Sequence, residues 1–231
     1  MLDLSDRVRG LFVKLPSTDV VEIVAASGLD FLVLDLEHSQ LADGDAFRLL
    51  AHARALRFPA LVRIPELDRA LVNRLLEMGA AGIQLSMVRC VAHVEELHAA
   101  CRYAPLGRRS VSLGHAAAGY GALSLGEYLG GQGAGPLVVA QIETGETDDS
   151  LADILAARPD VVFVGRTDLT ADLGLDEARV RERVEEIAAA AEQAGVPLGA
   201  VSWEDPRVRY QIVGTDLGLL RRGVLEAGRP G

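Results

Sequence analysis

Short apolar runs alternate with longer amphipathic segments along nearly the whole sequence. The apolar runs are rich in leucine and valine and continuously hydrophobic, which is typical of strands covered on both faces. Strands that alternate with helices indicate repeated strand–helix units around a parallel sheet. The predicted strands are residues 8–14, 31–35, 60–63, 82–85, 137–141, 161–164, 197–201 and 211–214. The predicted helices are residues 18–27, 43–56, 67–78, 90–102, 147–157, 177–194 and 216–225.

Eight strands joined in this way predict a closed barrel. The chain has 231 residues, and one (β/α)8 TIM barrel takes roughly 200–250 residues. We therefore predict an α/β protein made of a single barrel domain over residues 1–231. An open, doubly wound sheet is the structural alternative.

Two connections break the regular rhythm of the predicted units. The Gly- and Ala-rich segment 105–136 is much longer than an ordinary connection, and such loops are usually lids or binding segments. In contrast, only residues 203–209 separate the last two strands. That spacing is too short for a full crossover helix, so we expect a seventh helix shortened to about one turn.

Charge and hydropathy exclude several classes of partner. The formal net charge of −10 argues against nucleic acid, because phosphate binding needs clustered cations. No apolar run reaches the roughly 18 residues of a membrane span. The first six residues carry neither a basic start nor an apolar stretch, so we expect no secretory signal and a cytoplasmic protein.

Polar side chains gather where the predicted strands end. In a barrel these ends meet at one face, which carries the active site in this class of fold. The polar residues at the strand ends, in chain order, are Lys14, Asp35, Glu37, His38, Arg63, Gln84, Ser86, Gln141, Glu143, Arg166, Thr167 and Asp168. The sequence therefore predicts one polar site at this face.

Glu143 and Asp168 follow neighbouring strands and are candidate metal ligands. Carboxylate oxygens without nearby cysteine suit a hard cation such as Mg²⁺ or Mn²⁺, with Co²⁺ as a further option. Two protein ligands leave positions for water and for a chelating 2-oxo acid. The alternative is structural: either carboxylate could pair with an arginine, and Asp168 could cap the following helix.

Arg63 and His38 would complete such a site. The fixed charge of Arg63 could bind substrate oxygens and stabilise an enolate, or could instead form a salt bridge with Glu37 or Asp35. His38 is the acid–base candidate because an ordinary histidine pKa lies near neutrality. His115, in the long segment 105–136, is a weaker candidate to reach the site.

Other catalytic classes find little support. The glycine-rich stretches do not follow the dinucleotide or Walker patterns, and no nucleophile elbow is present. Schiff-base chemistry needs a lysine in the barrel, and Lys14 is the only lysine of the chain. Metal-assisted enolisation is therefore preferred over imine chemistry.

Several motifs together resemble the class II pyruvate aldolases. This family includes 4-hydroxy-2-oxoheptanedioate and 2-keto-3-deoxyrhamnonate aldolases, with macrophomate synthase and the citrate lyase β-subunits as relatives. The motifs extend over about residues 11–223 and are specific as a set. They are LFVKLPS at 11–17, DFLVLDLEH at 30–38, VRIP at 62–65, LLEMGA at 75–80, RYAPLGRR at 102–109, QIET at 141–144, DL at 168–169 and GTDLGLL at 214–220.

The resemblance implies roles for individual residues. It places the divalent metal on Glu143 and Asp168 and pyruvate against Arg63, with Gln141 close to the substrate. It makes His38 the acid–base group, with Asp35 nearby. The family pairs this histidine with an aspartate where this chain has Glu77, so Glu77 is predicted as a further catalytic residue.

The chain departs from the family around the predicted substrate pocket. Arg166 replaces a proline before the second ligand, where it could bind a second carboxylate or phosphate or remain a solvated loop arginine. Ser86 stands where a proline is usual, and we predict that Ser86, Arg166 and Thr167 contact substrate. Family members form hexamers by exchanging C-terminal helices; the short seventh helix and abbreviated C-terminus leave the choice between trimer and hexamer open.

The resulting hypothesis is reversible aldol cleavage of a 4-hydroxy-2-oxo acid to pyruvate and an aldehyde. A 2-oxo acid decarboxylase, or a carbon–carbon bond-forming enzyme of the macrophomate synthase type, would use the same site. A non-catalytic barrel that binds a 2-oxo acid is the alternative from another class.

Overall fold

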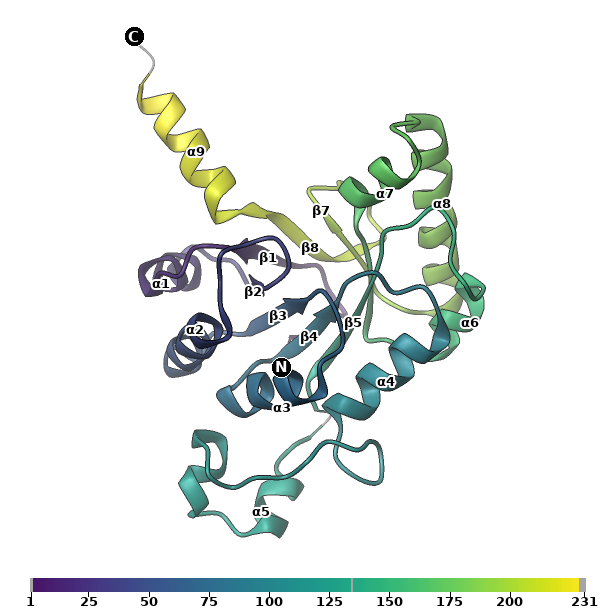
Figure 1. The fold of residues 1–231 in the computed structure, drawn as a ribbon. Coiled ribbons are helices and arrows are strands. Elements are labelled where there is room, and N and C mark those ends of the chain that lie inside the picture. Colours follow the sequence, from purple (N-terminus) through teal and green to yellow (C-terminus); the bar gives the residue numbers. More distant parts are fainter. Residues whose placement is uncertain (1, 134, 229–231) are drawn as a thin grey trace.

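Eight parallel strands pair in chain order and close into a barrel (Figure 1). The structure is a computed structural model that describes residues 2–133 and 135–228. The strands are β1 Val8–Val13, β2 Phe31–Asp35, β3 Ala60–Ile64, β4 Gly82–Leu85, β5 Leu137–Ile142, β6 Val161–Val164, β7 Leu198–Val201 and β8 Val208–Thr215. The predicted (β/α)8 barrel is confirmed, and an open sheet is excluded because β8 pairs with β1.

Helices connect most of the strands on the outside of the barrel. They are α1 Thr18–Ala26, α2 Asp43–Ala55, α3 Arg69–Met78, α4 Val91–Cys101, α5 Leu125–Gly130, α6 Leu151–Ala156, α7 Arg166–Asp172, α8 Glu177–Ala194 and α9 Asp216–Ala227. The predicted helix 147–157 shrinks to the six residues of α6 because Ser150 caps its start. The short helix α7, directly after β6, was not predicted.

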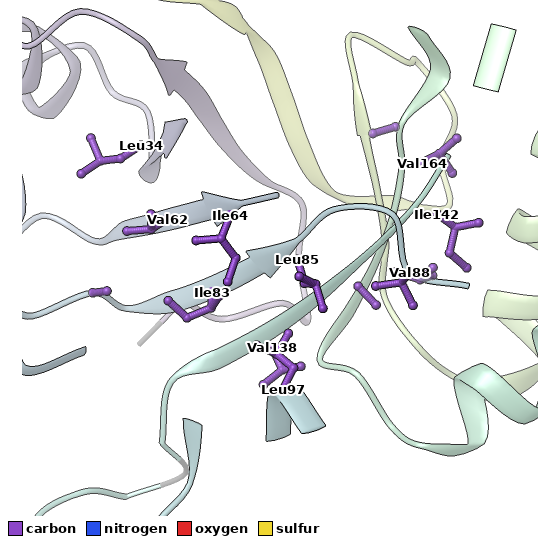
Figure 2. Close-up of a cluster of buried hydrophobic side chains, with 14 of the residues drawn as sticks. Leu34, Val62, Ile64, Ile83, Leu85, Val88, Leu97, Val138, Ile142 and Val164 are labelled. Carbon is purple, nitrogen blue, oxygen red and sulfur yellow. The ribbon is translucent and has the colours of Figure 1, made fainter. Parts of the chain in front are cut away.

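Side chains of each strand alternate between the barrel interior and the layer under the helices. The outward layer is aliphatic: Leu34, Val62, Ile83 and Val138 pack against helix residues such as Leu97 (Figure 2). This outer layer is the larger part of the hydrophobic core. It fixes the strand register, because a one-residue slip would expose the whole apolar set.

The barrel interior is aromatic toward the amino ends of the strands and polar toward their carboxyl ends. Phe31 stacks on Tyr210 with ring centroids 4.5 Å apart, and Phe163 meets Tyr210 edge-on at 6.0 Å. Beyond the paired interior residues Val33 and Leu61, Asp35 and Arg63 occupy inward positions at the carboxyl ends of β2 and β3. The alternation that buries the aromatic rings therefore also directs these charged groups into the mouth of the barrel.

The long segment 105–136 does not cover that mouth. It leaves α4 and returns to the start of β5, and it carries a 3-10 helix at Ala116–Gly121 and the short helix α5 (Figure 1). Because helices of a barrel run back toward the amino ends of the strands, this segment lies at the face opposite the strand ends. Within one chain, segment 105–136 therefore cannot be a lid over the carboxyl ends of the strands, as its length suggested.

The connection from β7 to β8 contains no helix, since a turn near Pro206 alone separates the two strands. The prediction of a seventh helix of about one turn was therefore wrong, because no helix forms between these two strands. After β8, helix α9 extends away from the barrel (Figure 1). Its first residue is anchored, because the Asp216 carboxylate accepts the backbone N–H groups of Lys14 and Leu15, both at 2.9 Å.

None of the helices in residues 2–133 and 135–228 has the length and apolarity needed to cross a membrane.

Candidate active site

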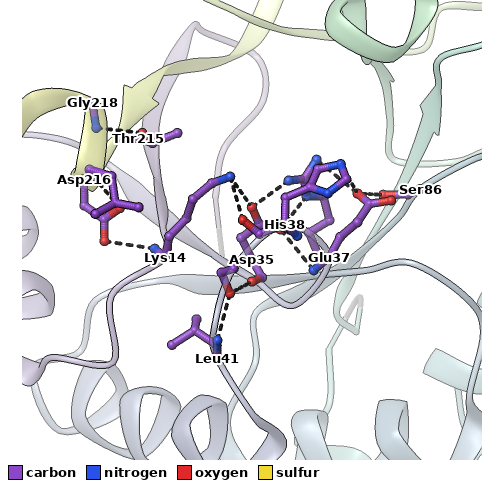
Figure 3. Close-up of polar contacts among 12 residues, drawn as sticks. Lys14, Asp35, Glu37, His38, Leu41, Ser86, Thr215, Asp216 and Gly218 are labelled. Atoms are coloured by element: carbon purple, nitrogen blue, oxygen red, sulfur yellow. Dashed lines mark hydrogen bonds and ion pairs between the residues drawn. The ribbon is translucent and has the colours of Figure 1, made fainter. Parts of the chain in front are cut away.

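A network of charged side chains fills the mouth of the barrel at the carboxyl ends of β1 to β6. Figure 3 shows Lys14, Asp35, Glu37, His38 and Ser86 pointing toward one another from β1, β2 and β4. The expectation that strand-end polar residues converge is met for these five side chains. Lys14, Asp35, Glu37 and Ser86 continue the inward alternation of their strands, whereas His38 lies in the bend after β2, where its backbone N–H donates to Asp35 Oδ1.

Arg63 lies at the centre of this network and is almost fully buried. Its Nε donates to Asp35 Oδ1 at 2.9 Å and its Nη2 to Asp35 Oδ2 at 2.6 Å. Its Nη1 lies 3.2 Å from Glu37 Oε2, and its guanidinium lies 4.6 Å from the Phe12 ring centroid. The salt bridge considered as an alternative is thus present, and it fixes the guanidinium plane while N–H groups remain for a substrate oxygen.

Asp35 contacts two cationic side chains, Arg63 and Lys14, and the backbone that follows β2. Its Oδ2 lies 3.1 Å from Lys14 Nζ, and its Oδ1 accepts the backbone N–H groups of Glu37 and His38, both at 3.1 Å. Burial raises the pKa of Asp35, but the hydrogen bonds and charge of Arg63, aided by His38 N–H and Lys14, outweigh burial and lower the pKa to about 2. Asp35 is therefore a permanent anion that orients Arg63.

Ser86 fixes Glu37, and the His38 ring lies between Glu37 and Asp168. The Ser86 hydroxyl donates to Glu37 Oε2 at 2.6 Å, so its predicted contact with substrate competes with this bond. The His38 ring is half exposed, and its Nε2 lies 3.9 Å from Glu37 Oε2 and 4.0 Å from Asp168 Oδ2. The Lys14 ammonium donates to the His38 carbonyl at 2.9 Å and so holds this segment in place.

Glu143 is a buried carboxylate held by neutral donors. Its Oε1 accepts the Met87 N–H at 2.8 Å and its Oε2 accepts Gln141 Nε2 at 2.5 Å. Burial raises the pKa of Glu143, these two hydrogen bonds oppose the shift, and the negative charges of Glu37 and Asp168 add to it. Among the ion pairs of the described residues, none joins an arginine or lysine to Glu143 or Asp168.

This arrangement fits a divalent cation. Mutually repelling carboxylates without a cationic side chain between them present oxygen ligands for a hard ion such as Mg²⁺ or Mn²⁺. Within residues 2–133 and 135–228, no group of three or more His, Cys, Asp and Glu side chains could hold an ion. Water and substrate would therefore complete the coordination, as Mg²⁺ commonly requires. Asp168 is not a helix cap, because Gly165 holds that position of α7.

Arg166 and Thr167 are exposed at the start of α7. Arg166 Nη2 donates to Glu177 Oε2 at 3.0 Å, across the gap between α7 and α8. The guanidinium is turned to the flank of the barrel, where it lines a cavity of about 380 Å³ together with Trp203. Of the two readings left open for Arg166, the structure favours a solvated arginine in a surface ion pair, which contributes little energy.

Glu77 lies at the opposite end of the barrel from His38. It belongs to the last turn of α3, just before the Gly79 cap that leads to the start of β4. There it accepts Asn73 Nδ2 at 3.1 Å, and Asn73 Oδ1 in turn accepts Arg109 Nε at 3.1 Å. Direct contact between Glu77 and His38 in one chain is therefore contradicted.

His115 is also remote from the mouth, in the segment between α4 and β5. It is buried against Tyr128 with ring centroids 5.3 Å apart. The expectation that His115 could reach the site was wrong within one chain, because segment 105–136 lies at the amino ends of the strands.

Lys14 and Glu37 were expected at this face as strand-end polar residues, but no role in the site was assigned to Lys14, and Glu37 was considered as a salt-bridge partner of Arg63. One participant, the Met87 N–H, was missed from the sequence. The Met87 N–H could not have been found, because its direction depends on a left-handed backbone with φ 53°.

The close approach of β6 to Glu143 makes Gly165 a sensitive position. A Cβ at residue 165 would lie 2.4 Å from Glu143 Oε2 and 3.2 Å from Gln141 Nε2. We expect Gly165→Ala to displace Glu143 and to lower activity at least tenfold, because the carboxylate cannot shift without losing its hydrogen bonds. Gly44→Ala, at an open helical position, is the control and should keep full activity. Equal activities of the two variants would contradict the assigned position of Glu143.

Comparisons with known proteins identify relatives of this barrel. Residues 9–210 match the family model described as HpcH/HpaI aldolase/citrate lyase. A 5-keto-4-deoxy-D-glucarate aldolase of Salmonella arizonae is 29% identical over 230 residues, covering 93% of this chain and 88% of the relative.

Solved structures agree with this match. An HpcH/HpaI aldolase/citrate lyase family protein from Burkholderia cenocepacia has a TM-score of 0.88 at 27% identity, covering 96% of this chain and 93% of its own. Macrophomate synthase has a TM-score of 0.83 at 25% identity, covering 98% and 85%.

The barrel, its charged mouth and these relatives define a class of enzyme: the protein is a carbon–carbon lyase of the aldolase type. The chain belongs to the HpcH/HpaI aldolase/citrate lyase family. The family resemblance stated from the sequence motifs is thereby confirmed.

Proposed function

We propose that the protein cleaves a 4-hydroxy-2-oxo acid reversibly to pyruvate and an aldehyde, with a divalent metal ion. The observation that carries this proposal is the Arg63 guanidinium, which Asp35 fixes in the same barrel mouth as Glu143 and Asp168. Among residues 2–133 and 135–228, no arginine or lysine pairs with these two carboxylates. A cationic fork in the same site as a carboxylate pair that could bind a cation is suited to an enolate, whose negative charge develops on oxygen.

Three residues of the mouth, Arg63, Asp35 and His38, have direct roles in this reaction. Arg63 binds the 2-oxo acid oxygens and stabilises the enolate, while Asp35 keeps the guanidinium in one orientation. His38 accepts the proton of the C4 hydroxyl as the C3–C4 bond breaks and the aldehyde forms. The electron pair of that bond becomes the enolate of pyruvate. Its C3 then takes one proton, from the protonated His38 or from water, and becomes the methyl group of pyruvate.

Glu143 and Asp168 would hold Mg²⁺ or Mn²⁺, with Co²⁺ as a further option. When bound there, the ion would act as a Lewis acid that polarises the 2-oxo group. Gln141 supports this assignment because its amide fixes Glu143 from the barrel interior.

A substrate panel tests the function. The relative from Salmonella arizonae is named for 5-keto-4-deoxy-D-glucarate, so we expect this dicarboxylic compound or a close 4-hydroxy-2-oxo acid to release pyruvate when Mg²⁺ or Mn²⁺ is present. Pyruvate is measured with lactate dehydrogenase. Release of CO₂ from oxaloacetate without any aldol cleavage would favour the decarboxylase alternative. Tight pyruvate binding without turnover of any compound would favour the non-catalytic barrel.

We also propose that the protein works as a homo-oligomer, a trimer or hexamer. Helix α9 presents apolar side chains without packing on the barrel: Leu217, Leu220, Val224 and Leu225 are each more than 40% exposed. Such a helix is normally covered by another chain. Since Glu77 and His38 of one chain lie at opposite ends of the barrel, the predicted contact between them could form only between two subunits of such an oligomer.

The exposed face of α9 gives a test of assembly. We expect a Leu220→Glu, Val224→Glu variant to shift the protein toward the monomer in size-exclusion chromatography with light scattering, because it places charge on the apolar contact. Leu175→Glu, at a leucine that is 74% exposed elsewhere, should leave the mass unchanged. A wild-type protein that is monomeric at micromolar concentration would contradict this proposal.

A further inference from the structure

A line of buried polar side chains crosses the barrel interior and ends on Glu143. It runs from Tyr210 on β8 through Gln84 on β4 and Gln141 on β5, and all four side chains are at most 2% exposed. The Tyr210 hydroxyl lies 3.5 Å from Gln84 Oε1, Gln84 Nε2 lies 2.5 Å from Gln141 Oε1, and Gln141 Nε2 lies 2.5 Å from Glu143 Oε2. Barrel interiors are ordinarily filled by branched aliphatic residues, so two adjacent amides need an explanation.

The chemistry of the carboxylate sets the direction of every bond in this line. An ionised Glu143 can only accept, so Gln141 must turn its Nε2 toward Glu143 and its Oε1 toward Gln84. Gln84 must then present its own Nε2 to Gln141, which leaves its Oε1 to accept the Tyr210 hydroxyl. All donors therefore point toward Glu143, and each amide is fixed by the next.

Gln141 depends on Gln84 for this orientation. Without a donor from β4, Gln141 Oε1 would be buried and unsatisfied, which costs about 1–3 kcal/mol unless the side chain rotates. Rotation of Gln141 would remove one of the two hydrogen bonds of Glu143, leaving only the Met87 N–H. The carboxylate would then lose its fixed position beside Glu37 and Asp168, whose charges repel it.

We infer that Gln84 is a positioning residue that orients Glu143 for metal binding through the Gln141 amide. The inference rests on the proposed function, because it concerns the metal held by Glu143. Gln84 is fully buried, and its side chain contacts Gln141 and Tyr210, so we expect its effect to be on the geometry and affinity of the site.

Mn²⁺ binding to the purified full-length protein, measured by electron paramagnetic resonance of free Mn²⁺, tests this inference. Gln84→Met keeps the volume and removes both hydrogen bonds, and we expect it to weaken Mn²⁺ binding about 10-fold or more. Leu61→Met places the same side chain at another fully buried interior position and should leave Mn²⁺ affinity within twofold. The lost activity of Gln84→Met should return when Mn²⁺ is raised to saturation, which a general packing defect would not show.

A double-variant cycle sharpens the test. Gln141→Met should weaken Mn²⁺ binding, and adding Gln84→Met to it should weaken binding no further, since the line is already broken. Should Gln84→Met fail to fold, as judged by circular dichroism, Gln84→Asn replaces it; its shorter amide should show the same loss and the same recovery. Unchanged Mn²⁺ affinity in a folded Gln84 variant, or fully additive losses of affinity in the cycle, would overturn the role of Gln84 and leave the proposed metal site standing. A wild-type protein that binds no Mn²⁺ would overturn it together with the proposed metal site.

Discussion

Arg63→Met is expected to lower kcat for pyruvate formation by about 10²–10³-fold or more, the usual loss when a fixed donor to a developing oxyanion is removed. The guanidinium is held by Asp35 in two hydrogen bonds and by the Glu37 charge, so its orientation is fixed before substrate binds. Arg63→Lys should lose nearly as much activity, because an ammonium cannot reproduce the planar two-point contact.

Part of the loss in Arg63→Met will be structural. Removing Arg63 leaves Asp35 as a buried, partly uncompensated charge, which costs roughly 3–5 kcal/mol of stability. The double variant Arg63→Met, Asp35→Asn removes that charge and should recover most of the melting temperature without recovering activity. Activity that returns together with the melting temperature would contradict the role of Arg63 at the enolate.

Glu143→Gln is expected to abolish both catalysis and stabilisation by metal. In the wild type, free Mn²⁺ at 100 times its Kd should stabilise the fold by about 2.7 kcal/mol. For a domain of this size that corresponds to a rise in melting temperature of about 5–10 °C in differential scanning fluorimetry. The variant should show no rise, because a neutral amide is a poor ligand for a hard cation.

Glu146→Gln is the matched control for that experiment. Glu146 is an exposed carboxylate three residues further along the same loop, and its replacement should leave the Mn²⁺ response intact. A full Mn²⁺ response in Glu143→Gln would mean that the metal site lies elsewhere.

Strand periodicity explains why much of this site could be predicted. Asp35, Arg63, Gln141 and Glu143 fall at inward positions of apolar strands, and in a parallel barrel these positions meet at one face. The family motifs then supplied roles for the same residues. Local sequence was sufficient to predict these positions, because the strands pair in chain order and the direction of each side chain follows from its place in its own strand.

The failures concern elements whose place depends on the path of the chain. A long loop suggests a lid, but segment 105–136 follows α4 rather than β4, and so it lies at the amino ends of the strands. Glu77 was assigned by resemblance alone, and its position in the last turn of α3 separates it from the His38 of the same chain; its catalytic role stays a prediction. Arg166 was taken as a possible pocket residue because of its neighbour, whereas its actual partner, Glu177, opens the next helix.

Deuterium exchange into the methyl group of pyruvate tests the central claim most directly, because it requires only enolate formation and no knowledge of the aldehyde. The metal-free protein is incubated with pyruvate in D₂O, with and without Mg²⁺ or Mn²⁺, and the methyl signal is followed by NMR. We predict exchange that depends on the added metal and is lost in both Arg63→Met and Glu143→Gln. Exchange that proceeds without metal, or no exchange under any of these conditions, would contradict a metal-dependent pyruvate aldolase.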